Sequence, residues 1–468
     1  MSVAHLESRK KHAARLWTEY TDAQGPRQLD KWIAQRLKVE KKFGSQDRKF
    51  YSNTLFSIAR HLHSYLFRRH CILHFGLKDL SQFQSIDRAT QKRALESFAQ
   101  ASSTESESWT LIRSASSDDL LDFVFSIVSP ENSGFCELGA FQEQAEARFI
   151  LPESSFSAQS FEALSALLLA YGIPIAWAEQ VVQRARQCGW DSQATLTFIR
   201  GQNERAPLWI RLNHADKKAI VEQELLSLGL TLSWADDVAA SVEGSFGLYQ
   251  AASFKSGYFE IQDLASQQIA ASVRARPGEK IWDACAGGGG KTVALAADLR
   301  GKGALYATDV REYKLDEVKR RTIRAGFHNI RTLGWDASST LKTGIEVERQ
   351  SGFDAVLVDA PCSSSGTWRR NPDARLRVAS FAHRSELVAL QTKILKQASL
   401  QVRPGGRLVY ATCSWCVDEN EGVVQAFMEQ AGKSFSKSSA TQHGKLLGHP
   451  AQDSDTMFVA VFDRNSEI

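Results

Sequence analysis

The sequence has no long apolar stretch free of charged residues, and no apolar segment follows the basic residues in its first part, Met1 to Trp17. The first absence argues against a membrane-spanning helix and the second against a signal peptide. Cysteine is scarce as well. The seven cysteines, an odd number, are scattered from Cys71 to Cys416 without the regular spacing of a secreted disulfide-bonded scaffold. We therefore expect a cytoplasmic protein that has reduced thiols and does not contact a membrane.

The chain carries little net charge, +4, but its charges are unevenly distributed. Residues 1–80 contain sixteen Lys and Arg against seven Asp and Glu, whereas residues 81–150 contain five against eleven. A basic front of this kind is explained by a solvated helical surface, or by a surface that attracts a phosphate backbone in a salt-sensitive way. With 468 residues, 43% of them hydrophobic, the chain is long enough for about two to four domains with real cores.

Residues 1–145 are predicted to form an all-helical domain. Apolar residues recur at helical spacing over residues 28–43 and 45–75, and Gly44-Ser45 between them is typical of a helix stop followed by an N-cap. The serine-rich stretch 101–117 predicts a loop, and a further helix is expected over residues 120–128.

Residues 146–255 predict linker helices followed by a small α+β module. A helix over residues 161–171 and another after Pro174 precede a strand at 207–213, a helix at 216–228 and a strand at 245–252. The tryptophans of this region could stack on nucleic-acid bases, but we favour buried positions. They are Trp177, Trp209 and Trp234.

Residues 256–468 alternate between strand and helix patterns, which predicts an α/β domain with a mostly parallel, doubly wound sheet. Strands are expected over residues 280–284, 304–309, 330–334, 355–359, 407–412 and 457–462. Helices are expected over residues 291–299, 312–325, 385–401 and 419–430. Ligand sites of such sheets lie at the carboxyl ends of the strands, so residues that directly follow a strand are the first candidates for function.

A glycine-rich loop joins the first of these strands to its helix, in the run Asp283-Ala-Cys-Ala-Gly-Gly-Gly-Gly-Lys291-Thr292. It is not a nucleotide triphosphate loop, because that motif needs glycine where Cys285 stands, and it fits the dinucleotide spacing poorly. Acidic residues stand at or just after the ends of the next three strands. A glycine loop together with these acids is the pattern expected for S-adenosylmethionine, because carboxylates can bind its ribose hydroxyls, its adenine amino group and the positive end of its methionine part. The predicted cofactor-binding residues are Cys285, Ala286, Gly287, Gly288, Gly289, Gly290, Lys291, Asp309, Asp336 and Asp359.

Two cysteines are predicted to meet at this edge of the sheet. Cys362 lies in the turn after the fourth strand, and Cys413 follows the fifth. Methylation of carbon 5 of cytosine requires a thiolate that first adds to carbon 6, and a strand end near helix amino ends and arginines such as Arg369 and Arg370 favours the thiolate form. A zinc or redox pair of Cys413 with Cys416 is the weaker alternative, since no second pair or His cluster accompanies it, and we predict no metal site. For Cys285 we favour a small buried residue that lines the cofactor loop.

These motifs resemble the RNA cytosine-5 methyltransferases, in particular their RsmB (Fmu/Sun) branch. The resemblance rests on the glycine loop, Asp359-Ala-Pro-Cys-Ser, Arg369-Arg-Asn-Pro-Asp373, Tyr410-Ala-Thr-Cys-Ser and Glu419-Asn-Glu421. It implies that Cys413 is the nucleophile, that Cys362 assists product release, and that Asp359 touches the cytosine ring. Upstream, Gly44-Ser-Gln-Asp-Arg48 is similar to a NusB-like RNA-binding domain and Pro207 to Asn213 to the family's RRM-like lead-in module.

The resemblance implies a monomeric enzyme that forms 5-methylcytosine in RNA, with 16S ribosomal RNA as the first expected substrate and no role on DNA. The target base must leave its stack for the thiol to reach it, so a loop or unfolded segment is expected. Transfer RNA is an alternative substrate. A second alternative, a ribosome-assembly factor with weak catalysis, rests on Gly288, where the family usually has proline; glycine there loosens the cofactor loop by about 1 kcal/mol.

Overall fold

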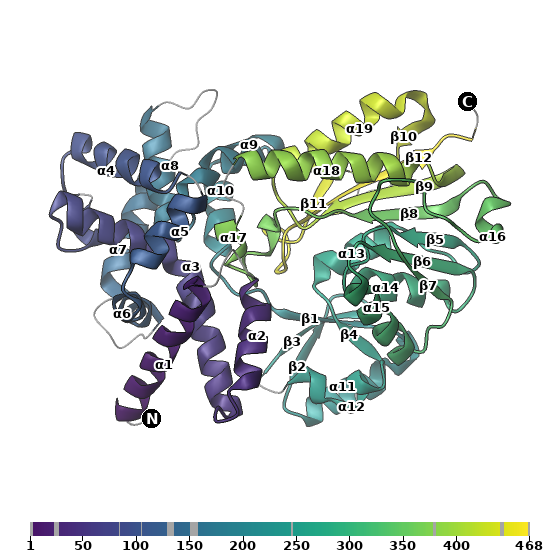
Figure 1. Cartoon of the computed structure of the whole chain (residues 1–468), viewed down its shortest axis with the longest axis horizontal. Helices are drawn as coiled ribbons and strands as arrows, with labels where there is room; N and C mark the ends of the chain where they lie inside the picture. Colours follow the sequence, from purple (N-terminus) through teal and green to yellow (C-terminus); the bar gives the residue numbers. More distant parts are fainter. Residues whose placement is uncertain are drawn as a thin grey trace. The chain divides into compact units, whose positions relative to one another are not determined.

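The computed structural model describes residues 3–22, 28–83, 85–103, 105–128, 135–149, 158–244, 247–377, 381–439 and 444–466. The chain forms two compact units, Met1–Arg205 with Thr367–Arg384, and Ala206–Gly366 with Ser385–Ile468. We call them the helical unit and the α/β unit (Figure 1). This division differs from the predicted one, because residues 146–205 and the segment Thr367–Arg384 lie with the helical unit. None of the described helices is long and apolar enough to cross a membrane.

The helices predicted over residues 28–43 and 45–75 are confirmed as α2 and α3, with Gly44 at the amino end of α3. The predicted loop at 101–117 is wrong, because most of it forms α5. Trp109 and Ile112 of α5 are buried, and this burial outweighs the poor helix propensity of the serines. The helices of the unit are α1 Val3–Asp22, α2 Leu29–Val39, α3 Ser45–Phe75, α4 Arg88–Ala101, α5 Glu105–Ser114, α6 Ser117–Val128, α7 Phe135–Arg148, α8 Ala158–Ala170, α9 Ala178–Cys188, α10 Ser192–Gly201 and α17 Ala374–Arg377.

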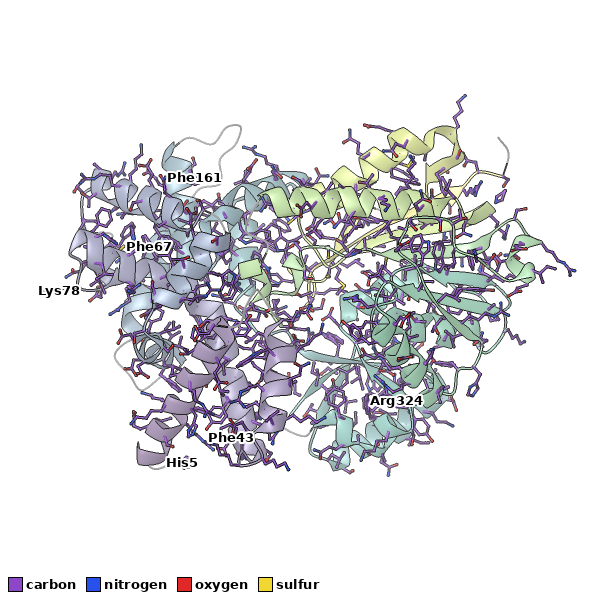
Figure 2. All side chains as sticks on the ribbon, in the orientation of Figure 1. His5, Phe43, Phe67, Lys78, Phe161 and Arg324 are labelled. Atoms are coloured by element: carbon purple, nitrogen blue, oxygen red, sulfur yellow. The ribbon has the colours of Figure 1, made fainter. Side chains whose placement is uncertain are left out.

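An aromatic cluster fills the core of the helical unit around Phe67 of α3, which Figure 2 labels. Its ring meets those of Phe83, Phe98 and Phe141 at centroid distances of 5.1, 5.4 and 6.1 Å. Part of the basic excess of residues 1–80 is neutralised inside this unit. Arg9 pairs with Asp47 at 2.6 Å, and Arg36 pairs with Glu19 at 2.6 Å and Glu40 at 2.9 Å.

The α/β unit begins with a small module whose sheet has the order β2-β3-β1-β4. The strand predicted at 245–252 is wrong: residues 248–250 form a 3-10 turn whose Leu248 packs into the module core, and α12 begins at Ala252. The missed hairpin β2–β3 turns at Asp236, whose Oδ1 accepts the backbone N–H groups of Val238 and Ala239. The elements are β1 Leu208–Leu212, α11 Lys218–Ser227, β2 Thr231–Trp234, β3 Ala239–Glu243, α12 Ala252–Lys255 and β4 Phe259–Ile261.

The predicted burial is confirmed for Trp177 and Trp209, which are 0% and 8% exposed. Trp234 is half-buried, and its indole N–H donates to Glu222 at 3.1 Å. Tryptophans with these surroundings serve packing.

The main sheet of the α/β unit confirms the predicted parallel α/β architecture, with the order β10-β12-β9-β8-β5-β6-β7 and β12 antiparallel to β9. All six predicted strands are present, whereas β10 and β11, each of three residues, were not predicted. The strands are β5 Lys280–Asp283, β6 Ala304–Asp309, β7 Ile330–Gly334, β8 Phe353–Asp359, β9 Val402–Thr412, β10 Phe435–Lys437, β11 Lys445–Leu447 and β12 Met457–Arg464. The helices are α13 Leu264–Ser272, α14 Gly290–Leu299, α15 Glu312–Arg324, α16 Ile345–Glu348, α18 Phe381–Ser399 and α19 Val423–Ala431.

Because β5, β6, β8 and β9 run parallel, their carboxyl ends share one edge of the sheet. The glycine loop follows β5 there, Asp309 ends β6 and Asp359 ends β8.

Candidate active site

The two predicted thiols lie against each other, with the Sγ atoms of Cys362 and Cys413 3.3 Å apart. The backbone explains this proximity. Asp359 of β8 is in register with Ala411 of β9, so the residues that follow these neighbouring strands emerge side by side. Directly after the thiol turn, the N–H of Gly366 donates to the carbonyl of Cys413 at 3.0 Å, which ties the two loops together.

The two thiols are electrostatically different. The hydrogen bond from Cys362 lowers the pKa of Cys413, assisted by the Ser364 hydroxyl at 3.6 Å and the charge of Lys291. The same hydrogen bond, together with burial and the negative charge of Glu419, raises the pKa of Cys362. The thiolate is therefore favoured on Cys413, and the proton on Cys362.

Lys291 and Asp359 form an ion pair beside the thiols, with 2.7 Å between Nζ and Oδ2. Although burial lowers the pKa of Lys291, the charge of Asp359 raises it overall, so the lysine is a cation. The sequence predicts both residues as cofactor ligands but not their pairing, because Lys291 starts α14 and Asp359 ends β8.

The glycine loop is held by side chains from the next strand and helix. The N–H of Gly287 donates to Oδ2 of Asp309 at 3.1 Å, and Arg321 of α15 donates to the Gly288 carbonyl at 2.7 Å. Asp283, before the loop, is 0% exposed, and burial raises its pKa to about 7. Its Oδ2 accepts the Thr292 hydroxyl at 2.7 Å, while Oδ1 has no hydrogen-bond partner in the part of the chain that the structure describes.

A cavity of about 570 Å³ lies at the ends of β6 and β7. Val310, on its wall, is 66% exposed, and Asp336 holds its carboxylate by accepting the N–H of Ser338 at 2.9 Å. The cavity is lined by Val310, Glu312, Leu333, Gly334, Trp335, Asp336, Ser339, Thr340, Leu341 and Lys342. S-Adenosylmethionine is an adenosine joined to a cationic amino acid. Apolar side chains suit its adenosine, and the glycine loop, the carboxylates and the unpartnered Asp283 oxygen suit its polar and cationic parts, so the residues present fit this cofactor.

Arg369, one of the two arginines that follow the thiol turn in the sequence, has its side chain buried in the helical unit. The side chain is 2% exposed and donates to the Glu204 carbonyl at 3.2 Å.

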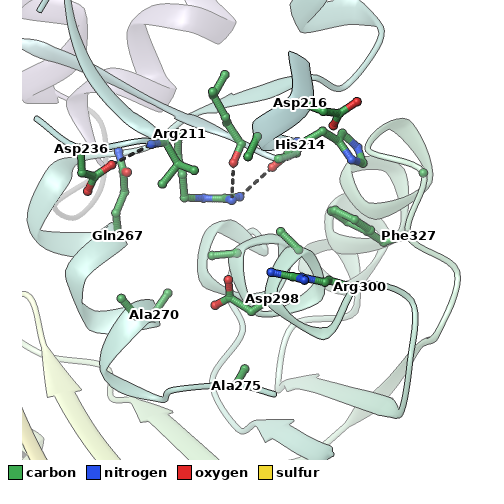
Figure 3. A pocket seen from close by; sticks show the side chains of 18 of the residues that line it. Arg211, His214, Asp216, Asp236, Gln267, Ala270, Ala275, Asp298, Arg300 and Phe327 are labelled. Carbon is green, nitrogen blue, oxygen red and sulfur yellow. Dashed lines mark hydrogen bonds between the residues drawn. The ribbon is translucent and has the colours of Figure 1, made fainter. Parts of the chain in front are cut away.

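A larger cavity, of about 960 Å³, lies elsewhere in the α/β unit and contains none of the predicted site residues (Figure 3). Asp298 and Arg300, on its wall, come from the carboxyl end of α14, whereas Lys291 stands at the amino end. Arg211, also on the wall, donates to Gln262, to the Leu212 carbonyl and to Asn213. The larger cavity of this unit is therefore not the one at the strand ends, where the predicted site residues lie. Among the residues described, no three His, Cys, Asp or Glu side chains are grouped to hold a metal ion.

Comparison with known proteins finds a matching family. Residues 270–463 match the family described as 16S rRNA methyltransferase RsmB/F. This part of the chain is similar to that family. The match contains the glycine loop, the three strand-end acids and both thiols.

The chain is also similar to curated proteins named ribosomal RNA small subunit methyltransferase B. The one from Vibrio cholerae is 29% identical over 301 residues, 63% of this chain and 66% of the relative. The one from Xanthomonas campestris is 30% identical over 57% of this chain and 60% of the relative. The alignments thus span less than two thirds of the length of these relatives.

Solved structures share the fold. The protein PH0851 gives a TM-score of 0.62 at 20% identity and covers 93% of this chain and 94% of its own. NSun6 from Pyrococcus horikoshii, solved with SFG, gives a TM-score of 0.52 at 17% identity, covering 62% of this chain and 98% of its own. At these identities the likeness establishes the fold alone.

Proposed function

We propose that the chain is an S-adenosylmethionine-dependent RNA methyltransferase that forms 5-methylcytosine, with 16S ribosomal RNA as its substrate. The observation that carries the proposal is the contact between Cys362 and Cys413, 3.3 Å apart at the ends of neighbouring strands, with the thiolate favoured on Cys413. A methyltransferase that acts on an amino group or an oxygen needs no such pair, whereas carbon 5 of cytosine becomes nucleophilic only after a thiolate has added to carbon 6.

In the proposed reaction the Cys413 sulfur bonds to carbon 6, and the electron pair of the carbon 5–carbon 6 double bond becomes available at carbon 5. S-Adenosylmethionine supplies the methyl group. Loss of the carbon 5 proton to a base then expels the Cys413 thiolate and restores the double bond. Cys362 lies against Cys413 and carries a proton, so its S–H is placed to donate a hydrogen bond to the Cys413 thiolate as that thiolate leaves.

The remaining site residues bind the cofactor and orient the target cytosine. We assign the cofactor to the loop Cys285–Lys291, with Asp309 at its ribose, Asp336 at its adenine amino group and Asp359 near its methionine part. Asp359 also reaches the cytosine ring, and Lys291 holds that carboxylate in place. The target cytosine must be unstacked for the thiol to reach it. We assign RNA recognition to the NusB-like helical unit and to the RRM-like module, and we expect the enzyme to be a monomer.

The test is incubation of the protein with 16S RNA and labelled S-adenosylmethionine. Cys413→Ala should abolish transfer, whereas Cys362→Ala should accumulate a protein–RNA adduct that survives denaturation. Cys188→Ala is the control, since Cys188 is an exposed thiol of the helical unit. Transfer that persists without Cys413 contradicts the mechanism, labelling of transfer RNA alone contradicts the substrate, and no labelling of any RNA favours an assembly factor.

A further inference from the structure

Glu419 is a buried carboxylate close to the thiols. It is 0% exposed and lies in the π-type turn Asp418–Gly422 before α19. Its Oε1 accepts the N–H of Ser363 at 2.8 Å and the amide of Gln391 at 3.0 Å; its Oε2 accepts the hydroxyls of Ser363 and Ser414, both at 2.5 Å. Four polar groups thus surround the two carboxyl oxygens, an arrangement that suits a carboxylate. Within the described residues, no Lys, Arg or His forms an ion pair with it.

The donors to Glu419 come from the two thiol loops. Ser363 follows Cys362, and Ser414 follows Cys413. Gln391 of α18 also donates to the carbonyl of Pro361, directly before Cys362, at 2.9 Å. The Glu419 carboxylate therefore forms hydrogen bonds with both thiol loops. Gln391 of α18 contacts this carboxylate and the Cys362 loop as well.

We propose that Glu419 is a positioning residue for the thiol pair: its carboxylate holds the two loops so that the sulfurs touch, and its charge keeps the shared proton on Cys362. The inference rests on the proposed function and adds to it the group that decides which thiol is the nucleophile. A buried negative charge beside the Cys362 loop disfavours a thiolate there, and Lys291 favours one on Cys413.

Other ionisable groups around the pair do not supply this bias. Asp359 and Lys291 are paired at 2.7 Å, and they act on Cys413 in opposite directions: the charge of Asp359 raises its pKa and that of Lys291 lowers it, so the pair adds little net bias. The remaining neighbours are buried groups whose pKa values burial raises, which keeps them neutral. They are Cys285, Tyr410 and Cys416. Asp418, next to Glu419, faces Cys416.

The proposal is tested by alkylation with iodoacetamide, without RNA or cofactor, followed by peptide mass spectrometry. The initial rates at Cys413 and Cys362 are compared from pH 6 to pH 10 in wild type and Glu419→Gln. In wild type, Cys413 should react faster, and Glu419→Gln should reduce the ratio of the two rates by about tenfold, the effect of one pKa unit. Glu429→Gln, an exposed carboxylate on α19, is the matched control and should leave the ratio unchanged.

An unchanged ratio in folded Glu419→Gln overturns the proposal. Equal rates for the two thiols in wild type overturn it as well, and this measurement does not depend on whether the variant folds. Glu419→Asp, which keeps the charge, should retain more of the ratio than Glu419→Gln. Because alkylation needs no methyl transfer, a wild-type protein with unequal thiols and no activity on RNA would contradict the proposed function and leave the role of Glu419 standing.

Discussion

Asp283 shows how one buried group links the cofactor site to stability. Its carboxyl is fully buried, and its pKa rises from the ordinary 3.8 to about 7, chiefly because burial disfavours the charge. Between these values the folded protein binds more protons than the unfolded chain. The contribution of Asp283 to stability is therefore largest below the ordinary pKa, falls as the pH rises towards 7, and changes little above it.

Asp283→Asn should remove this pH-dependent loss of stability, because asparagine can accept a hydrogen bond from the Thr292 hydroxyl without carrying a charge. We expect the wild-type melting temperature to fall between pH 5 and pH 8 by roughly 3 °C more than that of the variant. Thermal melts followed by tryptophan fluorescence provide the measurement. Asp316→Asn, an exposed carboxylate on α15, serves as the control and should melt like wild type at both pH values. Parallel pH dependence of Asp283→Asn and wild type would refute the assignment.

At the scale of elements, α15 supports the glycine loop. Arg321 donates to the Gly288 carbonyl at 2.7 Å and to Glu260, a 2% exposed carboxylate, at 3.0 Å; Arg324, one turn on, holds the other oxygen of Glu260. A β-carbon at Gly288 would lie 3.1 Å from the Glu317 carboxylate, at the end of a flexible side chain. The hydrogen bond from Arg321 therefore holds the loop at Gly288, the position at which the family that this chain resembles usually has a proline that stiffens the loop.

Arg321→Ala should weaken S-adenosylmethionine binding about tenfold, since a hydrogen bond from a charged donor contributes about 1.5–3 kcal/mol. Arg324 still neutralises Glu260 in this variant, so the fold should persist. Isothermal titration calorimetry measures the dissociation constant. Arg320→Ala, the exposed neighbour on α15, is the control. If both variants bind equally well, Arg321 does not hold the loop.

The elements that the sequence predicts correctly are those whose pattern is local. β8, for example, is a short and mostly apolar run that is buried along its length, and this pattern by itself predicts a buried parallel strand. The errors arise where tertiary context decides: the serine-rich stretch becomes α5 because Trp109 and Ile112 find a core. The contact between Cys362 and Cys413 could be predicted, because the order of the strands brings the two loops to the same edge of the sheet. The sequence does not predict the hydrogen bonds of Glu419 to both thiol loops, because its donors come from three separate segments that no spacing connects.

At the scale of the whole molecule, the chain passes from one unit to the other directly after the Cys362 turn. Gly366, the last residue of the α/β unit there, approaches Thr456 so closely that a β-carbon would lie 1.7 Å from its carbonyl oxygen, so only glycine fits. The next segment, Thr367–Arg384, is embedded in the helical unit. Arg375 is 0% exposed and donates to the carbonyls of Tyr171 and Gln202, and the ring centroids of Trp368 and Trp177 lie 4.9 Å apart.

A fragment of residues 206–468 should therefore keep its sheet but lose the order of segment 367–384, because Arg375 and Trp368 no longer have their buried partners. Limited trypsin digestion should cut the fragment after Arg369, Arg370 or Arg375 at least tenfold faster than the full chain, since cleavage follows the population of the open segment. Residues 1–205 added as a separate chain should restore protection, and the exposed Arg320 supplies an internal reference site. A fragment as resistant as the full chain would show that the segment does not depend on the helical unit. Because this segment follows the thiol turn directly, the fragment's protection and its methyl transfer should be lost together and recovered together.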